Sequence, residues 1–305
     1  MLVKILGSAA GGGFPQWNCN CPGCQAARLP SGQRQSRSHQ AKTLTQSSIA
    51  VRAYDGSWLL VNASPDVRSQ LEMLRTQQEF SSSRSHPIAG IILTDAEIDH
   101  TTGLILLRES SQPLKVYSMP SVKRSLTTGY PLFSTLQNYC GVEWFPLEQK
   151  MTLLGLEIEV FPLSNKPPKY MQHQSESEEI WGVGLTFRDR VTGGILTYTP
   201  GLAELNDSIK ERFEASHCIL VDGTFWKNDE LPALGIGSRT ARQMGHLPLS
   251  GDDGSLAQLA KLSVPRKILV HINNTNPILI PDSDEHQAVK AAGIEIGYDG
   301  LAIAL

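Results

Sequence analysis

Long hydrophobic runs and dense stretches of one charge are both missing from this chain of 305 residues. No segment approaches the about 18 consecutive apolar residues of a membrane-spanning helix, and the apolar run in residues 1–6 is too short for the core of a signal peptide. The formal net charge is −3, and there is no basic stripe that could follow a nucleic-acid backbone. We therefore expect a soluble cytoplasmic protein with no membrane span and no nucleic-acid partner.

Cysteine is scarce, and its five residues are an odd number, which argues against a disulfide framework. Three of them are crowded at Cys19, Cys21 and Cys24, where a Pro-Gly turn can bring three thiolates to one point. This pattern predicts a zinc knuckle in residues 17–25, with the fourth ligand supplied from a distant part of the chain. The alternative, three unrelated thiols, fits less well because cytosolic chains rarely crowd cysteines without a metal or redox role.

One short stretch concentrates side chains that can bind a metal ion. The apolar residues 88–93 predict a buried strand. Four metal-binding side chains follow it within six positions: Asp95, Glu97, Asp99 and His100. Loops that follow strands commonly carry the chemistry of a protein, so this loop is a candidate metal site. The alternative is a solvated loop in which Asp95 caps the next helix.

A buried strand that stops on an ionisable residue recurs twice in the later part of the chain. Residues 217–222 end on Asp222, and residues 267–271 end on His271. This repetition suggests ligands gathered at one edge of a sheet. Two early hairpins and a later alternation of strands and helices favour an α+β fold. We expect a four-layer αββα sandwich, two mixed sheets with helices outside, as a single domain over residues 1–305.

Three other segments carry weaker signals. Residues 28–42 are polar and basic without apolar periodicity, which predicts a loop. Residues 165–179 contain two adjacent prolines and three glutamates, and they predict a long loop that is either a binding segment or disordered. Residues 298–300 contain an Asp-Gly pair, which predicts a closing hairpin.

The candidate metal loop resembles a known signature. Residues 94–103 are similar to the metallo-β-lactamase sequence Thr-His-x-His-x-Asp-His-x-x-Gly, with Asp95 and Glu97 in place of the two leading histidines. The family's downstream histidine would fall near residues 163–165 and its bridging aspartate near residues 198–201, and neither is present. The resemblance therefore implies the same fold, with most of one of its two metal sites lost.

The ligands of the other half-site are present. The resemblance implies that Asp99, His100 and the late His271 hold one metal ion. Two imidazoles and a carboxylate with open positions are the ligand set of non-heme Fe(II) oxygen chemistry. Glu97 is a candidate fourth ligand or general base, and Asp95 a candidate for orienting a ligand histidine.

Two further candidate catalytic residues come from the same resemblance. Asp222 and His246 lie in what look like degenerate forms of motifs that phosphodiesterase and tRNA-processing relatives carry. They are expected to contact substrate or to orient the metal ligands. Phosphodiesterase relatives close the zinc knuckle with a histidine at the position of Asn274, whose amide oxygen is a weak zinc ligand.

The knuckle, the altered metal loop and residues 271–277 together resemble the protein B family of pyrroloquinoline quinone (PQQ) biosynthesis. This implies a bacterial cytoplasmic protein that helps to make PQQ from a Glu-Tyr peptide. It implies a structural Zn(2+) and an active-site Fe(2+), which zinc can replace in isolated protein. The expected reaction is O2-dependent hydroxylation of the tyrosine ring, alongside other PQQ-pathway proteins.

Two alternatives remain beside this hypothesis. A non-catalytic carrier could transport PQQ or its precursor to the periplasm, and the loss of one metal site suits a retired enzyme. A residual single-metal hydrolase ranks lowest, because the bridging aspartate is missing. The sequence leaves open whether the chain forms a homodimer.

Overall fold

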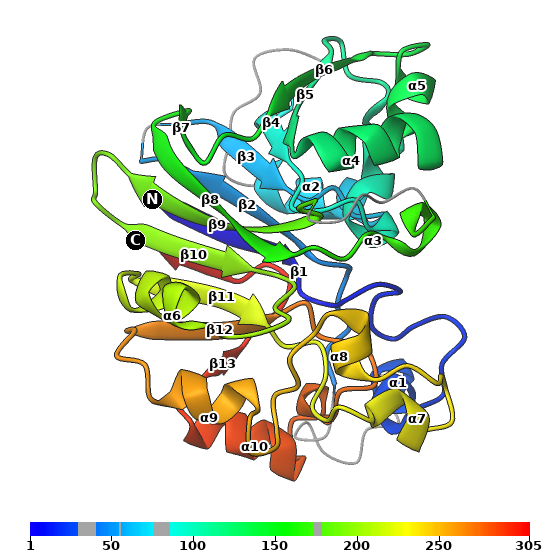
Figure 1. The fold of residues 1–305 in the computed structure, drawn as a ribbon, viewed down its shortest axis with the longest axis vertical. Coiled ribbons are helices and arrows are strands. Elements are labelled where there is room, and N and C mark those ends of the chain that lie inside the picture. The colour runs from blue at the N-terminus through cyan, green and yellow to red at the C-terminus, as the bar shows by residue number, and fades with distance from the viewer. Residues whose placement is uncertain (30–40, 55, 76–85, 174–178) are drawn as a thin grey trace. The chain divides into compact units, whose positions relative to one another are not determined.

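The structure is a computed structural model in which the strands form two mixed seven-stranded sheets (Figure 1). It describes residues 1–29, 41–54, 56–75, 86–173 and 179–305. The two polar segments expected to be loops thus lie partly outside the described residues. No helix in these ranges is long and apolar enough to cross a membrane.

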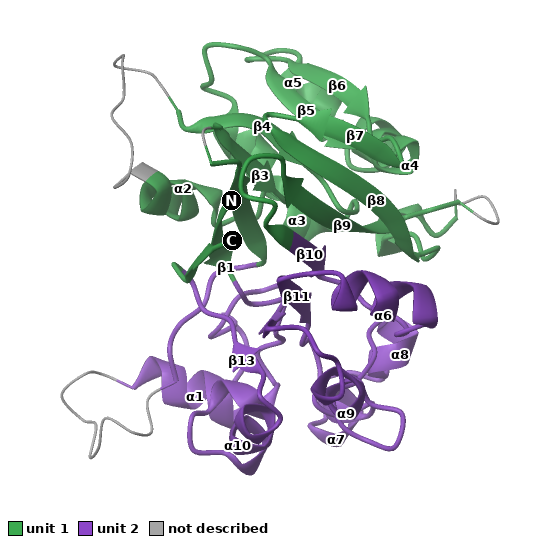
Figure 2. Cartoon of the chain, turned by 90° about the vertical axis from the view of Figure 1, so that its left-hand side faces the viewer, with its two compact units in different colours: residues 1–7, 47–195, 300–305 green, residues 8–46, 196–299 purple. Residues whose placement is uncertain are grey.

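The chain divides into two compact units, coloured separately in Figure 2. The first unit comprises residues 1–7, 47–195 and 300–305. The second comprises residues 8–46 and 196–299. Each unit carries one part of the residues singled out in the sequence, so each is described by itself.

The first unit is organised around a complete seven-stranded sheet. Its strands, in spatial order, are β14 (Ala302–Ala304), β1 (Leu2–Gly7), β2 (Ser48–Arg52), β3 (Trp58–Val61), β4 (Ile88–Ile92), β5 (Leu114–Ser118) and β6 (Val142–Pro146). Neighbours from β14 to β3 run antiparallel, and neighbours from β3 to β6 run parallel. Every residue of β3 is buried, which requires that both faces of the sheet are covered.

Short helices cover one face of this sheet. They are α2 (Val67–Arg75), α3 (Ile98–Thr101), η2 (Thr102–Leu107), α4 (Pro120–Arg124), η3 (Ser125–Gly129) and α5 (Leu132–Leu136). Leu74, Leu104, Val122 and Leu136 from these helices join Leu60 of β3 in one buried cluster. Burying each such side chain stabilises the fold by about 1.5–3 kcal/mol.

Three antiparallel strands complete the first unit. They are β7 (Lys150–Leu153), β8 (Leu156–Ser164) and β9 (Gly182–Asp189), and the short η4 (Lys169–Met171) lies between the last two. In β8 the buried Leu156 and Ile158 alternate with the exposed Glu157. This part of the strand therefore has one buried and one exposed face.

The second unit contains parallel strands. They are β10 (Ile195–Thr199, from Leu196 onward), β11 (Cys218–Asp222), β12 (Arg266–Val270) and β13 (Glu295–Ile296). Its helices are α1 (Pro22–Arg28), α6 (Asp207–Glu214), α7 (Glu230–Ala233), α8 (Ala241–Met244), α9 (Ser255–Ala260), η5 (Pro277–Leu279) and α10 (Asp284–Ala291). Because β11 and β12 are parallel, with Asp222 opposite Val270, the side chains that end these strands meet at one edge.

The prediction of a closing hairpin around residues 298–300 is wrong. β13 pairs in parallel with β12, and β14 pairs antiparallel with β1. The Asp299 carboxylate accepts hydrogen bonds from the backbone N–H groups of Ser8 and Thr45. Asp299 thus binds distant loops instead of closing a two-residue turn.

Candidate metal centres

The metal motif, residues 94–103, lies in the first unit directly after β4. His100 is buried in α3, and its Nδ1 lies 2.8 Å from both carboxylate oxygens of Asp95. Its Nε2 lies 3.7 Å from Oδ2 of Asp99. A carboxylate that holds Nδ1 fixes the tautomer in which Nε2 has the lone pair for a metal ion. The geometry is therefore the one expected if Asp95 orients His100.

Distant backbone and amide groups hold the motif in place. Asn62 has a left-handed backbone (φ 64°), is fully buried, and its amide bonds to the backbone N–H and to the hydroxyl of Thr94. The Thr94 hydroxyl in turn donates to Asp95 at 2.9 Å. On the other side, the carbonyl of Thr94 accepts from the N–H of Val183 at 2.9 Å.

The last residue of the motif, Gly103, has no room for a side chain. A Cβ on Gly103 would lie 2.1 Å from the carbonyl oxygen of Ser64 and 2.7 Å from that of Ala63. The same backbone segment binds the motif, because the N–H of Ala63 donates to the carbonyl of His100. Gly103 therefore allows the chain to pass close enough to fix His100.

The opposite charges of His100 and its carboxylate neighbours stabilise each other in the motif. Burial alone would lower the pKa of His100, but Asp95 and Asp99 outweigh it and raise that pKa to about 9 in the metal-free chain. Burial alone would raise the pKa of Asp95, yet His100 keeps it below its ordinary value. Glu97 is exposed, and its backbone N–H donates to Asp95 at 2.9 Å.

A second cluster lies in the second unit, where β11 and β12 end. The ligand atoms of Asp222, His246 and His271 all lie within 4.8 Å of one another. The Asp222 carboxylate accepts from Nδ1 of His246 at 2.6 Å, and the two imidazole rings stack with centroids 5.4 Å apart. Burial opposes the ionisation of Asp222, but His246 outweighs it and keeps the pKa of the carboxyl low.

Thr224 connects this carboxylate to the other histidine. Its hydroxyl lies 2.5 Å from Oδ1 of Asp222 and 2.8 Å from Nδ1 of His271. With the hydroxyl proton directed to Asp222, the hydroxyl oxygen accepts the Nδ1 proton of His271. Both histidines are then held through Nδ1, which leaves Nε2 of each for a metal ion or a proton.

Asp222 is better placed to orient these histidines than to bind a metal itself. Besides His246 and the Thr224 hydroxyl, its oxygens accept the backbone N–H groups of Leu202 and Thr224. Four donors occupy the lone pairs of a carboxylate that is 1% exposed. This geometry fits the orienting role that the sequence had left open for Asp222.

The donor sets suit a transition metal, because carboxylate-held imidazoles are common ligands of iron and zinc. Asp99 and His100 belong to the first unit and His271 to the second. Their meeting at one ion stays a prediction.

The cysteine knuckle is formed within the second unit. The sulfur atoms of Cys19, Cys21 and Cys24 lie within 4.8 Å of one another, and all three residues are buried. Burial and the neighbouring thiols raise the pKa of Cys21 to about 12, so in the metal-free chain this thiol stays protonated. Three clustered sulfurs fit zinc, which would displace such protons.

Asn274 is next to the knuckle, but its amide is a hydrogen-bond donor there. Its Nδ2 lies 3.3 Å from Sγ of Cys24, and its backbone carbonyl oxygen accepts a hydrogen bond of 3.4 Å from the thiol of Cys21. An amide N–H that points at a thiolate stabilises its charge. Asn274 thus contacts the sulfurs, and its role as a zinc ligand stays a prediction.

Sequence reasoning missed Asn62 and treated Thr224 only as part of a degenerate motif. Asn62 acts on Asp95 through Thr94, and Thr224 contacts the candidate ligand His271, and no local spacing marks such roles. The left-handed conformation of Asn62 is a signal that only coordinates reveal.

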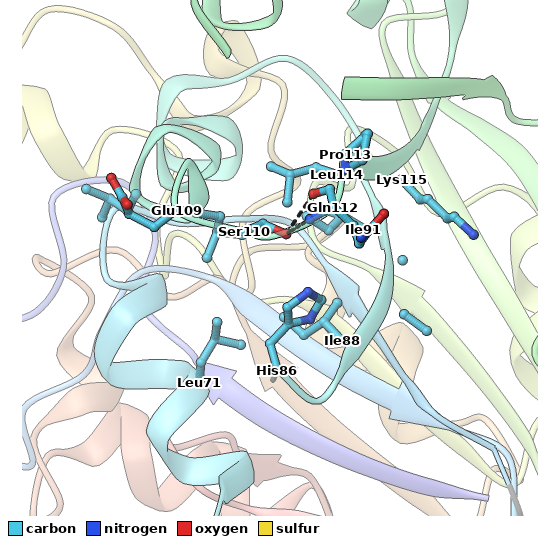
Figure 3. Close-up of a pocket in the computed structure, with 14 residues that line it drawn as sticks. Leu71, His86, Ile88, Ile91, Glu109, Ser110, Gln112, Pro113, Leu114 and Lys115 are labelled. Carbon is cyan, nitrogen blue, oxygen red and sulfur yellow. Dashed lines mark hydrogen bonds between the residues drawn. The ribbon is translucent and has the colours of Figure 1, made fainter. Parts of the chain in front are cut away.

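The first unit also has a cavity of about 550 Å³ away from the motif (Figure 3). Apolar side chains such as Leu71, Ile88 and Leu114 line it, with His86 and Glu109 among its polar residues. None of the candidate site residues is part of its wall. The cavity is therefore separate from the candidate metal-binding residues.

Comparison with known proteins first identifies the superfamily of this chain. The Beta-lactamase superfamily domain matches residues 57–272, which is more than half of the chain. The two mixed sheets with helices agree with this match, and the metallo-β-lactamase-like fold expected from the sequence is confirmed. The chain thus belongs to the metallo-β-lactamase superfamily.

Full-length relatives narrow the assignment. The chain is 45% identical to coenzyme PQQ synthesis protein B of Methylococcus capsulatus and 44% identical to that of Nitrosococcus oceani, with 100% of each chain covered. The crystal structure of Zn(2+)-bound PqqB from Methylobacterium extorquens matches with a TM-score of 0.86 at 35% identity over 100% of both chains. This chain is accordingly a member of the coenzyme PQQ synthesis protein B family.

A more distant structure shares the fold alone. A diphosphatase from the PhnP family matches with a TM-score of 0.66 at 20% identity, covering 100% of this chain and 97% of the other.

Proposed function

We propose that the chain is an Fe(2+)-dependent enzyme of PQQ biosynthesis that hydroxylates the tyrosine ring of a Glu-Tyr precursor with O2. The donor set carries the proposal: Asp99, His100 and His271 are the carboxylate and imidazoles of non-heme iron oxygen enzymes. The partners of the two Nδ1 atoms support it, because Asp95 holds that of His100 and the Thr224 hydroxyl holds that of His271, which leaves each Nε2 for a metal ion. The family relationship supports the pathway.

Bound iron with open coordination positions would supply the activation of O2. Each turnover inserts one oxygen atom of O2 into an aromatic C–H bond. The other oxygen atom leaves as water, with two electrons and two protons from an external reductant. The substrate ring must therefore lie beside the metal ligands. A side chain that can give or take a proton must also lie there.

His246 is our candidate for moving those protons. Its Nδ1 is held by Asp222 at 2.6 Å, and its side chain is 15% exposed, so Nε2 can exchange a proton with a bound phenol. Stacking on His271 keeps this group beside a metal ligand. Glu97 is the second candidate base, or a fourth metal ligand.

A structural Zn(2+) is proposed at Cys19, Cys21 and Cys24. The relative from Methylobacterium extorquens is Zn(2+)-bound, which supports a zinc-binding family. Zinc in the motif of isolated protein would block O2 chemistry, because it has no accessible redox change. Activity assays must therefore begin with protein loaded with iron.

The test is a single-turnover assay. Anaerobic protein loaded with Fe(2+) is mixed with the Glu-Tyr precursor, a reductant and oxygenated buffer, and the product is analysed by mass spectrometry. We expect a product heavier by one oxygen atom, and its loss in His100→Ala and His271→Ala. His217→Ala is the matched control, because His217 is exposed and precedes β11, whereas Asp222 ends that strand.

The same assay separates the enzyme from the carrier. Binding of the precursor without any oxygen insertion by the iron-loaded wild type would overturn the proposal. If binding also survived in both histidine variants, the carrier would be the better account.

A further inference from the structure

Tyr170 reaches the metal motif from the segment between β8 and β9. Its hydroxyl donates a hydrogen bond of 2.6 Å to the carbonyl oxygen of Ala96. Ala96 is fully buried and lies between Asp95 and Glu97. The tyrosine thus contacts the backbone of the motif at its centre.

The ring of Tyr170 is held by its own neighbours. Tyr130 packs against it edge to face, with ring centroids 6.0 Å apart. Met171 is fully buried, and a Cβ on Gly129 would lie 2.3 Å from its sulfur and 3.0 Å from the Tyr170 ring. This close packing keeps the hydroxyl at a defined position.

We propose that Tyr170 is a positioning residue for the metal site, which holds the turn at Ala96 so that Asp95 can orient His100. The turn is tight, since the N–H of Glu97 bonds to the Asp95 carboxylate. A free Ala96 carbonyl would have to find another donor, and the turn would shift with it. The site's geometry thus depends on a side chain from another element.

The chemistry of the hydroxyl suits this role. Burial, reinforced by the negative charges of Glu97 and Asp95, raises the pKa of Tyr170. The group therefore remains a protonated donor at neutral pH. An ionised phenolate could not donate to a carbonyl oxygen.

The test compares Tyr170→Phe with Tyr130→Phe by titrating metal-free protein with Co(2+), whose absorption distinguishes thiolate from imidazole and carboxylate ligands. Tyr130→Phe is the matched control, because its hydroxyl contacts the Thr102 side chain at 3.2 Å and no motif carbonyl. We expect Tyr170→Phe to raise the Kd of the motif site about tenfold. The thiolate signal of the knuckle should stay unchanged in both variants.

Two results would overturn the proposal. One is a Kd for Tyr170→Phe within about twofold of the wild type. The other is an equal rise in both variants, which would assign the effect to ring packing. If Tyr170→Phe does not fold, Gly129→Ala takes its place, since its methyl group crowds Met171 and the Tyr170 ring while the hydroxyl is kept. An unchanged Kd there counts against the proposal.

This inference rests on the proposed function only in taking the motif as a metal site. The titration contains neither oxygen nor substrate. A chain that binds the metal ion but never hydroxylates would fail the earlier test and still pass this one.

Discussion

The hydroxyl oxygen of Thr224 lies 2.8 Å from Nδ1 of His271. The same hydroxyl bonds to Asp222, which also holds His246 directly. One buried carboxylate therefore sets the orientation of two imidazole rings. A change at this carboxylate or at its connecting hydroxyl should alter metal binding without removing a ligand.

Thr224→Val should weaken binding of the metal ion that we propose His271 shares with Asp99 and His100. Valine has the same shape but no hydroxyl, so Nδ1 of His271 loses its partner and the ring can rotate. Loss of such outer contacts typically costs 10–100-fold in metal affinity, and we expect about tenfold. Competition with a metal-sensitive dye would measure it. Thr224→Ser, which keeps the hydroxyl, should bind like the wild type, and a serine variant as weak as the valine variant would contradict the argument.

Asp95→Asn should change stability in a pH-dependent way in chelator-treated protein. A histidine pKa raised from 6.5 to about 9 stabilises the fold fully below 6.5, and this contribution is lost as the pH rises through about 9. The lowered pKa of Asp95 adds stability above its ordinary 3.8, lost as the pH falls.

The free energy of unfolding of the wild type should thus exceed that of Asp95→Asn most near pH 6. The difference there should be about 3 kcal/mol, since the substitution breaks a buried pair. The difference should shrink above about pH 9. Urea unfolding at both pH values measures it. A difference that stays constant between them would show that the His100 charge is not the cause.

Gly103→Ala should destabilise the first unit and disturb His100. The new methyl group would meet two backbone carbonyls, which cannot rotate away as a side chain can. Overpacking of this kind costs about 1–3 kcal/mol, and more where the backbone must move. Gly201→Ala is the control, because nothing lies within 4 Å of its Cβ position. Thermal unfolding should separate the two variants clearly, and equal melting temperatures would refute the steric argument.

Much of the fold could be predicted from local patterns in the sequence. The strand expected at residues 88–93 is β4, shorter by one residue, and the metal-binding side chains follow it as the spacing indicated. The alternation in β8 and the run before Asp222 were equally visible, because each depends on neighbours in the chain. Period and spacing are local properties, so a single sequence contains them.

The parts that could not be predicted all depend on distant contacts. Tyr170 and Asn62 bond to the metal motif at Ala96 and Thr94, and Thr224 bonds to His271. None of the three has a distinctive spacing in the sequence. The wrong hairpin at residues 298–300 has the same cause, since Asp299 binds segments more than 200 positions away. Such contacts follow from topology and not from local preference.

The knuckle and the motif should lose their metal ions independently. We expect about two metal ions per chain in the wild type, one at each site. Cys24→Ser should remove the zinc, and His100→Ala should remove the ion at the motif. Emission spectroscopy of the purified proteins gives the counts. Loss of both ions in either single variant would contradict independence.

Asn274→Ala then decides the role of the amide at the knuckle. As a donor to the Cys24 sulfur, Asn274 stabilises a thiolate, so its removal should keep the zinc but release it to a chelator about tenfold faster. As a ligand through its oxygen, its removal should lower the zinc content as Cys24→Ser does. The contacts of Nδ2 to the sulfur favour the first outcome, and zinc loss on purification of Asn274→Ala would favour the second.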